Sequence, residues 1–218
     1  MKTILSLTLA FCATTLVARA SETANHACCA ETKPAKPACC ASTEPAAATA
    51  TPATNFTRHS LYQLDASWTN DAGAQVRLAE YRGEPVIVAM FFAQCEYACP
   101  MLVSDIKRVR EALPAAVRDQ ARVVLVSFDT ERDTPAALKA FRERMALDER
   151  WTLLRGDETA VQEFAMLLGV KFKRDARGQF AHSNLVTVLN AEGEIAQQRA
   201  GLQGDISELA KAVVVAAR

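Results

Sequence analysis

The sequence of 218 residues predicts an α/β domain with a central, mostly parallel sheet flanked by helices, and with a C-terminal β-hairpin and helix. Three observations lead to this fold class. Short, continuous apolar runs, typical of strands buried on both faces, occur at 86–92, 123–126 and 185–189. Segments with apolar residues at helical spacing separate or follow them. The last apolar run ends at a glycine-containing turn, from which the chain can return antiparallel.

The sequence of the first half of the domain predicts a β-α-β unit. Residues 61–68 alternate weakly, which indicates a strand or one arm of a hairpin. Pro85 opens the apolar strand at 86–92, and the strand at 123–126 completes the unit. Between them a helix is expected from Pro100, because apolar residues recur at helical spacing at Leu102, Ile106, Val109 and Leu113.

The middle of the domain predicts a helix, a strand and a second helix. Thr134 and Pro135 are typical of a helix start, with a capping hydroxyl and a proline in the first turn. One face of this helix carries Leu138, Phe141 and Met145. A short strand at 151–154 follows. The second helix has a stripe of Val161, Phe164, Ala165 and Leu168.

The C-terminal part predicts a hairpin and a closing helix. The strand at 185–189 turns at 191–193, and residues 194–200 can return antiparallel to it. The closing helix has one apolar face, made of Ile206, Leu209, Ala210 and Val213. This order of elements indicates a thioredoxin-like α/β fold, in which the reactive loop lies at the carboxyl end of the first buried strand.

The charge composition excludes two classes of protein. Lys and Arg number 25, Asp and Glu also number 25, and half of the residues are hydrophobic. A nucleic-acid-binding protein needs a basic excess, and an acidic disordered chain has few apolar residues. We therefore expect a folded domain and no nucleic-acid partner.

Residues 1–20 have the features of a secretory signal peptide. Lys2 precedes an apolar run from Ile4 to Val17, and Ala18-Arg19-Ala20 has the small-x-small form of a cleavage site. We therefore expect an exported, periplasmic protein. If the signal stays uncleaved, it anchors the chain in the membrane.

Residues 21–54 are rich in Cys, Ala and Pro and contain almost no large apolar side chain. Such a segment cannot bury a core, so we expect a disordered tail and linker. It contains a repeated Ala-Cys-Cys-Ala sequence, at 27–30 and 38–41. The folded domain is then predicted to span 55–218.

Cys95 and Cys99 directly follow the first buried strand of the predicted domain. Pro100 suits the first helical position, which would place Cys99 at or near the N-cap, where we expect the helix dipole to make it ionise readily. Two sulfurs at this spacing can close a disulfide or turn toward a common third point. A purely structural disulfide is the weaker alternative, because it would close only a very small loop.

His182 lies in a polar stretch, 179–184, just before the strand at 185–189. In a thioredoxin-like sheet the loop that enters this strand lies beside the reactive loop, so we expect His182 near the two cysteines. Oxidoreductases place a cis-proline there, whereas Ser183-Asn184-Leu185 contains no proline. Two thiolates and one imidazole suit copper, and zinc accepts the same donor types. Oxidation of the cysteine pair to a disulfide would remove both sulfur ligands.

Three motifs, in this order, resemble those of the SCO/SenC family. They are Cys95-x-x-x-Cys99-Pro100 after an apolar strand, the segment 126–135 after the next strand, and His182 before a later strand. The resemblance covers residues 56–218 and implies an exported or membrane-anchored, thioredoxin-like protein that binds copper, as Cu(I) or Cu(II), through Cys95, Cys99 and His182. It also implies that Asp129 lies close to the site.

The chain departs from that family at two positions and in its tail. Many members have proline where this chain has Glu96 and Thr130. The cysteine-rich tail lies outside the family pattern. Its donors could bind soft metal ions and pass them across the linker, although incidental or pairwise oxidised thiols are the alternative. These candidate auxiliary metal ligands are His26, Cys28, Cys29, Cys39 and Cys40.

The resemblance implies delivery of copper to the dinuclear copper site of cytochrome c oxidase, or reduction of the cysteines of that site. The expected partners are therefore a copper-receiving oxidase subunit and a thiol reductant. The alternative is a thiol-disulfide oxidoreductase that uses Cys95 and Cys99 on an exported partner, for which His182 would matter little. A peroxiredoxin is less well supported, since its Pro-x-x-x-Thr-x-x-Cys motif is absent from the sequence.

Overall fold

The structure, a computed structural model, describes residues 55–176 and 178–218. The signal peptide predicted at 1–20 and the tail predicted at 21–54 lie outside these residues. Within the described part of the chain, no helix has both the length and the apolar character that crossing a bilayer requires.

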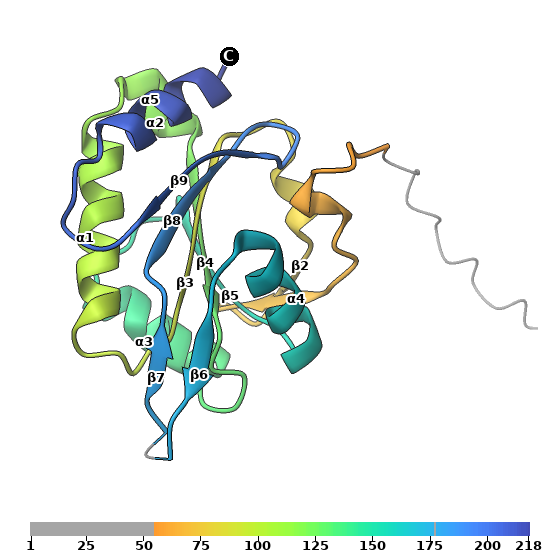
Figure 1. Ribbon diagram of the computed structural model, residues 1–218, viewed down its shortest axis with the longest axis vertical. Coiled ribbons are helices and arrows are strands. Elements are labelled where there is room, and N and C mark those ends of the chain that lie inside the picture. Colours follow the sequence, from red (N-terminus) through yellow and green to blue (C-terminus); the bar gives the residue numbers. More distant parts are fainter. Residues whose placement is uncertain (1–54, 177) are drawn as a thin grey trace, which may run out of the picture. The chain divides into compact units, whose positions relative to one another are not determined.

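Seven strands form the central sheet, in the order β2-β1-β5-β4-β3-β8-β9 (Figure 1). Their bounds are β1 Trp68–Asn70, β2 Gln75–Val76, β3 Val86–Phe91, β4 Arg122–Ser127, β5 Trp151–Arg155, β8 Leu185–Leu189 and β9 Ile195–Ala200. β4 pairs in parallel with β3 and β5, whereas the other neighbouring pairs are antiparallel. The thioredoxin-like α/β fold class is confirmed, but the sheet is mixed rather than mostly parallel. The chain enters β8 from a hairpin, not from the crossover helix that a parallel strand would need.

Helices cover both faces of this sheet. They are α1 Ala98–Glu111, α2 Ala115–Gln120, α3 Pro135–Arg144, α4 Glu158–Leu168 and α5 Ser207–Ala216. Arg199 of β9 donates a hydrogen bond to Asp105 of α1 at 2.6 Å, and the preceding Gln198 donates to the Leu168 carbonyl at the end of α4 at 2.9 Å. Because successive side chains of a strand point to opposite faces, α1 and α4 cover opposite faces of the sheet.

The apolar runs of the sequence form the centre of the sheet. Every residue of β3 is buried, and β3 lies between β4 and β8, with Val88 opposite Val124 on one side and Thr187 on the other. Phe141 of α3 packs on Phe91 of β3, with 4.8 Å between ring centres. The two neighbouring strands and helix α3 therefore hold β3 in place up to its carboxyl end.

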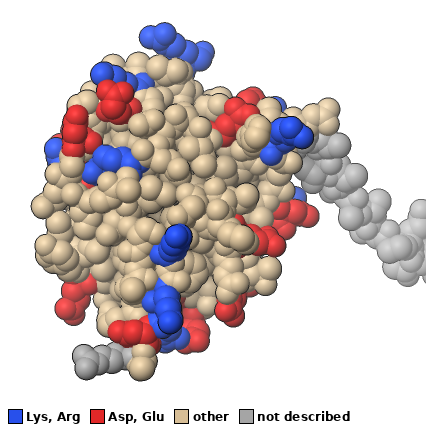
Figure 2. Space-filling view, in the orientation of Figure 1, with Lys and Arg blue, Asp and Glu red and all other residues tan. Residues whose placement is uncertain are grey.

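Charged side chains of both signs are interspersed on the face that Figure 2 shows. Among the described residues, exposed ion pairs include Arg77 with Asp65 and Arg82 with Glu192, each at 2.6 Å. Exposed pairs of this kind contribute about 0–1 kcal/mol each to stability.

Residues 61–68 do not form the predicted strand. Leu61–Gln63 is a 3₁₀-helix, in which the Ser60 hydroxyl accepts a hydrogen bond from the Tyr62 amide at 3.2 Å. Leu61 and Tyr62 are adjacent and both buried, which is incompatible with the alternating exposure of a surface strand. The first strand, β1, begins only at Trp68 and forms a hairpin with β2.

Several further elements were not predicted from the sequence. The short helix α2 lies between α1 and β4. β6 (Phe172–Arg174) and β7 (Phe180–His182) form a separate two-stranded antiparallel sheet, and β7 lies in the stretch 179–184 that the sequence predicted as a polar loop. We call this pair the β6–β7 hairpin. Its strands are too short for an alternating pattern to be visible, yet they carry His182.

Candidate metal centre

Cys95 and Cys99 lie on the connection from β3 to α1. The Cys95 amide donates to the Phe92 carbonyl at 3.2 Å, which folds the loop back on the end of the strand. The Cys95 residue is 8% exposed and Cys99 is fully buried. Helix α1 begins at Ala98, two residues earlier than predicted. Cys99 is therefore its second residue, and Pro100 is its third residue and not its first. Proline is tolerated there because the first helical amides have no intrahelical acceptor.

His182 is held at the end of β7 by pairing and by aromatic contacts. In the β6–β7 hairpin it lies opposite Phe172, and its ring lies 5.0 Å from the Phe128 ring and 6.0 Å from the Phe92 ring, between centres. The His182 Nδ1 lies 3.2 Å from the Ser183 carbonyl oxygen. The contact with that carbonyl occupies Nδ1, so Nε2 is the ring nitrogen that is left to coordinate a metal ion.

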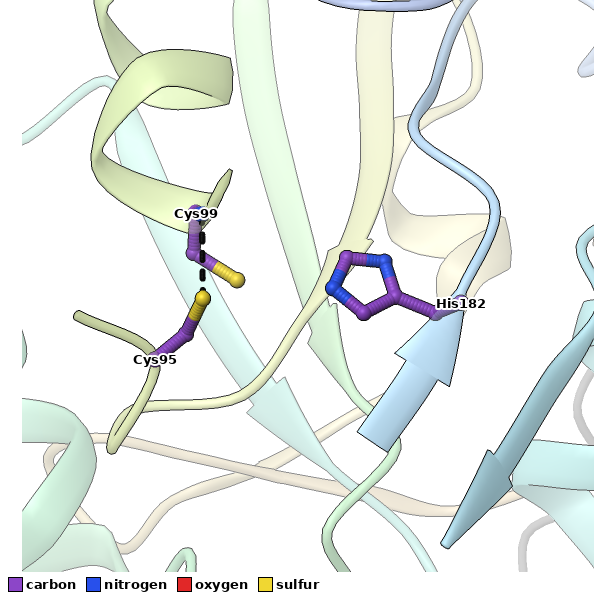
Figure 3. A group of neighbouring side chains, drawn as sticks. All are labelled: Cys95, Cys99 and His182. Carbon is purple, nitrogen blue, oxygen red and sulfur yellow. Dashed lines mark hydrogen bonds between the residues drawn. The ribbon is translucent and has the colours of Figure 1, made fainter. Parts of the chain in front are cut away.

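The three predicted ligands come together in space. Figure 3 shows the His182 ring pointing from the end of β7 toward the sulfurs of Cys95 and Cys99. Their ligand atoms all lie within 4.8 Å of one another, and they are the only such group among the described residues. Bonds of about 2.3 Å from one central ion would place ligand atoms roughly 4 Å apart, so small side-chain rotations suffice to hold a metal ion.

The two thiols have opposite pKa shifts. The pKa of Cys95 is lowered to about 4, chiefly by a hydrogen bond from the Cys99 thiol, against the effect of burial, and also by His182 and the Cys99 amide, which donates to Cys95 Sγ at 3.2 Å. The pKa of Cys99 is raised by that same bond to Cys95 and by burial. The prediction that Cys99 ionises readily is therefore wrong. The amide at the start of α1 points at the other sulfur, so the helix terminus stabilises a thiolate on Cys95.

Cys95 of the reduced, metal-free protein should react with iodoacetamide at a rate that stays constant from neutral pH down toward pH 4. The lowered pKa of about 4 keeps Cys95 a thiolate throughout that range, and protonation slows alkylation only as the pH falls through the pKa. Peptide mapping by mass spectrometry should show Cys95 modified and Cys99 protected. A Cys95 rate that already declines through the alkaline range would contradict this assignment.

Asp129 is connected to the site through Arg132, and no hydrogen bond joins it to a cysteine or to His182 among the described residues. Its buried carboxylate accepts from the Arg132 guanidinium at 2.5 Å, and Arg132 donates to the Gly178 carbonyl at 2.6 Å. Gly178 lies in the turn of the β6–β7 hairpin. Asp129 therefore fastens the hairpin that carries His182 and does not line the site itself.

Asp133 supports the cysteine loop and was not singled out from the sequence. Its fully buried carboxylate accepts from the Ala93 amide at 2.8 Å and from the Ser127 hydroxyl at 2.5 Å, and burial raises its pKa. Arg144 donates to the Ala93 carbonyl at 2.6 Å. The Ala93 peptide is thus held on both sides, two residues before Cys95. Only the position of Asp133 after a buried strand could have indicated this role.

Several known proteins are similar to this chain. A SCO1 protein homolog of Bacillus subtilis (strain 168) is 25% identical over 141 residues, which cover 63% of this chain and 72% of that protein. The structure of Bradyrhizobium japonicum ScoI with copper bound has a TM-score of 0.59 and 22% identity, covering 69% of this chain and 96% of that one. BsSco, a member of the Sco family of cytochrome c oxidase assembly proteins, has a TM-score of 0.61 and 23% identity, covering 69% and 90%. At these identities the two structures establish the fold alone.

The sequence profile of one family spans nearly the whole described domain. It is the SCO1/SenC profile, which matches residues 57–217. The match contains Cys95, Cys99 and His182 as well as Asp129. By this match over most of its length, the chain belongs to the SCO1/SenC family.

Proposed function

We propose that this protein is an exported copper-binding protein that holds its metal with Cys95, Cys99 and His182. The observation that carries the proposal is the convergence of two sulfurs and one imidazole nitrogen within 4.8 Å. Thiolates suit Cu(I), and the imidazole makes Cu(II) acceptable as well. The copper held by the related ScoI of Bradyrhizobium japonicum favours copper over zinc.

The bound copper is cargo, and its recipient is a copper-receiving subunit of cytochrome c oxidase with a dinuclear copper site. This assignment is supported by the place of BsSco among cytochrome c oxidase assembly proteins. Export is supported by the features of a signal peptide that the sequence of residues 1–20 has. Metal loading requires both cysteines reduced, because a disulfide removes both sulfur ligands. A thiol reductant is therefore a second partner.

Thiol-disulfide exchange on an exported partner is the second candidate function. One observation favours it: Cys95 combines a pKa of about 4 with a position beside a buried Cys99 of raised pKa. A thiolate next to a resolving thiol is the arrangement that exchange chemistry uses. This activity and copper binding draw on the same two sulfurs, so one protein can carry both in its reduced state.

Copper titration of two forms of the protein tests the proposal. The domain of residues 55–218 and the longer form of residues 21–218 are each loaded with Cu(I) under reducing conditions, and bound copper is measured after removal of free metal. We expect the domain to retain its site, and the disulfide form of the domain to lose it. A reduced domain that binds no copper would contradict the copper function itself.

The same titration tests the tail. We propose that His26, Cys28, Cys29, Cys39 and Cys40 hold additional metal, which the linker passes to the domain. The form with residues 21–54 should then bind more copper per chain than the domain alone. Equal stoichiometry in the two forms would contradict a metal-capturing tail and leave the domain site unaffected.

A further inference from the structure

An open groove lies beside Cys95. Its volume is about 710 Å³, and Cys95, Gln94, Glu96, Arg144 and Gln179 contribute to its lining. That volume falls within the range of about 300–1,000 Å³ that is usual for pockets that bind small molecules. The metal-binding role of Cys95 does not require such a groove, and of the three candidate ligands only Cys95 lines it.

Arg144 places a fixed cation at this groove. It is the last residue of α3, its guanidinium donates to the Ala93 carbonyl at 2.6 Å, and its Cζ lies 5.1 Å from the centre of the Phe141 ring. These contacts order the side chain although the residue is exposed. None of the ion pairs among the described residues includes Arg144. A guanidinium has five N–H donors, so donors remain for a carboxylate.

We propose that this groove is a binding site for a carboxylate-bearing thiol and its disulfide, in which Arg144 binds the carboxylate while the sulfur exchanges with Cys95. The proposal deepens the function proposed above and rests on it, because copper loading needs a reductant for the cysteine pair. Cys95 lines the groove and Cys99 is fully buried, so the reaction occurs at Cys95.

The reduction proceeds in two balanced exchanges. The thiolate of the bound thiol attacks Cys95 Sγ, the bond between Cys95 and Cys99 breaks, and its electron pair leaves on Cys99 Sγ, which takes up a proton. A mixed disulfide now joins the thiol to Cys95. A second thiolate attacks the sulfur of the bound thiol, releases the small disulfide and leaves Cys95 as a thiolate. Two small thiols are oxidised and the protein disulfide is reduced.

Glu96 is the anionic side chain that lines the same groove. It is exposed, and none of the ion pairs among the described residues includes it. Its carboxylate repels a second negative charge and attracts a positive one. Arg144 therefore attracts an anionic thiol, whereas Glu96 repels it. Substitution of each residue should have opposite effects on the reaction with an anionic reagent.

The test uses the reduced, copper-free protein, in which Cys95 attacks a small disulfide by the reverse of the same exchange. Rates are measured with three disulfides: those of mercaptopropionate, which is anionic, of mercaptoethanol, which is neutral, and of cysteamine, which is cationic. We expect Arg144→Gln to lower the rate with the anionic reagent, relative to the neutral one, by about fivefold. Glu96→Gln should raise that same ratio. Comparing each variant with the wild type cancels the intrinsic reactivity of the reagents.

Arg150→Gln is the matched control. Arg150 immediately precedes β5, at the end of the parallel strands opposite the site, and it too has no ion pair among those of the described residues. Its loss removes the same charge and should leave the ratio unchanged.

Three outcomes would overturn the proposal. An Arg144→Gln variant that slows all three reagents equally would mean that Arg144 only supports the loop through Ala93. An unchanged ratio would mean that no carboxylate binds there, and an equal change in Arg150→Gln would mean that only net charge matters. Copper binding by the wild-type protein is measured in parallel, so a failure of the copper function is recognised separately from a failure of this proposal.

Discussion

The variant His182→Ala should lose tight Cu(II) binding, with the affinity falling by more than about a hundredfold, which is the upper range for loss of a group that only supports a ligand. Imidazole is the nitrogen donor of the site, and Cu(II) depends on it more than Cu(I) does. The two thiolates should still bind Cu(I), more weakly than in the wild type. Equilibrium competition with a chromophoric chelator, for each oxidation state, measures both effects.

The control for this variant is His59→Ala, which removes a histidine far from the cysteines in the sequence and should change neither affinity. A second readout needs no metal: the pKa of Cys95 should rise in His182→Ala, because the hydrogen bond of His182 helps to lower it. Unchanged Cu(II) affinity in His182→Ala would contradict the assignment of His182 as a ligand, and retained disulfide exchange would then favour the oxidoreductase.

The substitution Phe128→Ala should lower the free energy of unfolding by about 3–5 kcal/mol. It should also weaken copper binding. Phe128 is 3% exposed and joins the main sheet to the β6–β7 hairpin. Its ring centre lies 5.2 Å from Phe172, 4.9 Å from Phe180 and 5.0 Å from His182. Removal of the ring leaves a cavity under the hairpin and removes a packing contact that positions the His182 ring. Urea denaturation followed by fluorescence measures stability, and copper titration measures the site.

Phe164→Ala separates these two effects. Phe164 of α4 is equally buried but packs on Trp68, with 5.5 Å between ring centres, and has no ring contact with His182 among the described residues. We expect it to cost a similar free energy of unfolding and to leave the copper affinity of the folded protein intact. If Phe128→Ala kept full Cu(II) affinity while folded, the aromatic cluster would not be what positions His182.

The main elements of the fold were predictable because they repeat one signal over many residues. The continuous apolar run at 86–92 predicts a strand buried on both faces, and β3 is indeed buried along its whole length. Thr134 and Pro135 marked the start of α3, where the Thr134 hydroxyl accepts from the Ala137 amide at 3.3 Å. Local chemistry decides such features, so the sequence is sufficient to place them.

The features that the sequence did not predict depend on contacts between distant segments. Ser60 caps a 3₁₀-helix whose side chains pack into the core, so weak alternation at 61–68 was misleading. The ionisation of Cys95 instead of Cys99 depends on the hydrogen bonds that the thiol and the amide of Cys99 donate to Cys95 Sγ. Asp133 reaches the cysteine loop only after the strands are paired. The proximity of the cysteines and His182 could be predicted, but not which sulfur carries the charge.

The β6–β7 hairpin sets the imidazole ligand apart from the two sulfur ligands. The two sulfurs are on the loop and helix that continue β3, whereas the nitrogen is on a separate two-stranded sheet. In the copper delivery that we propose, a ligand of the recipient would replace the imidazole first, while both sulfurs would hold the ion. Stepwise substitution of this kind would make the transfer rate depend on the concentration of the recipient.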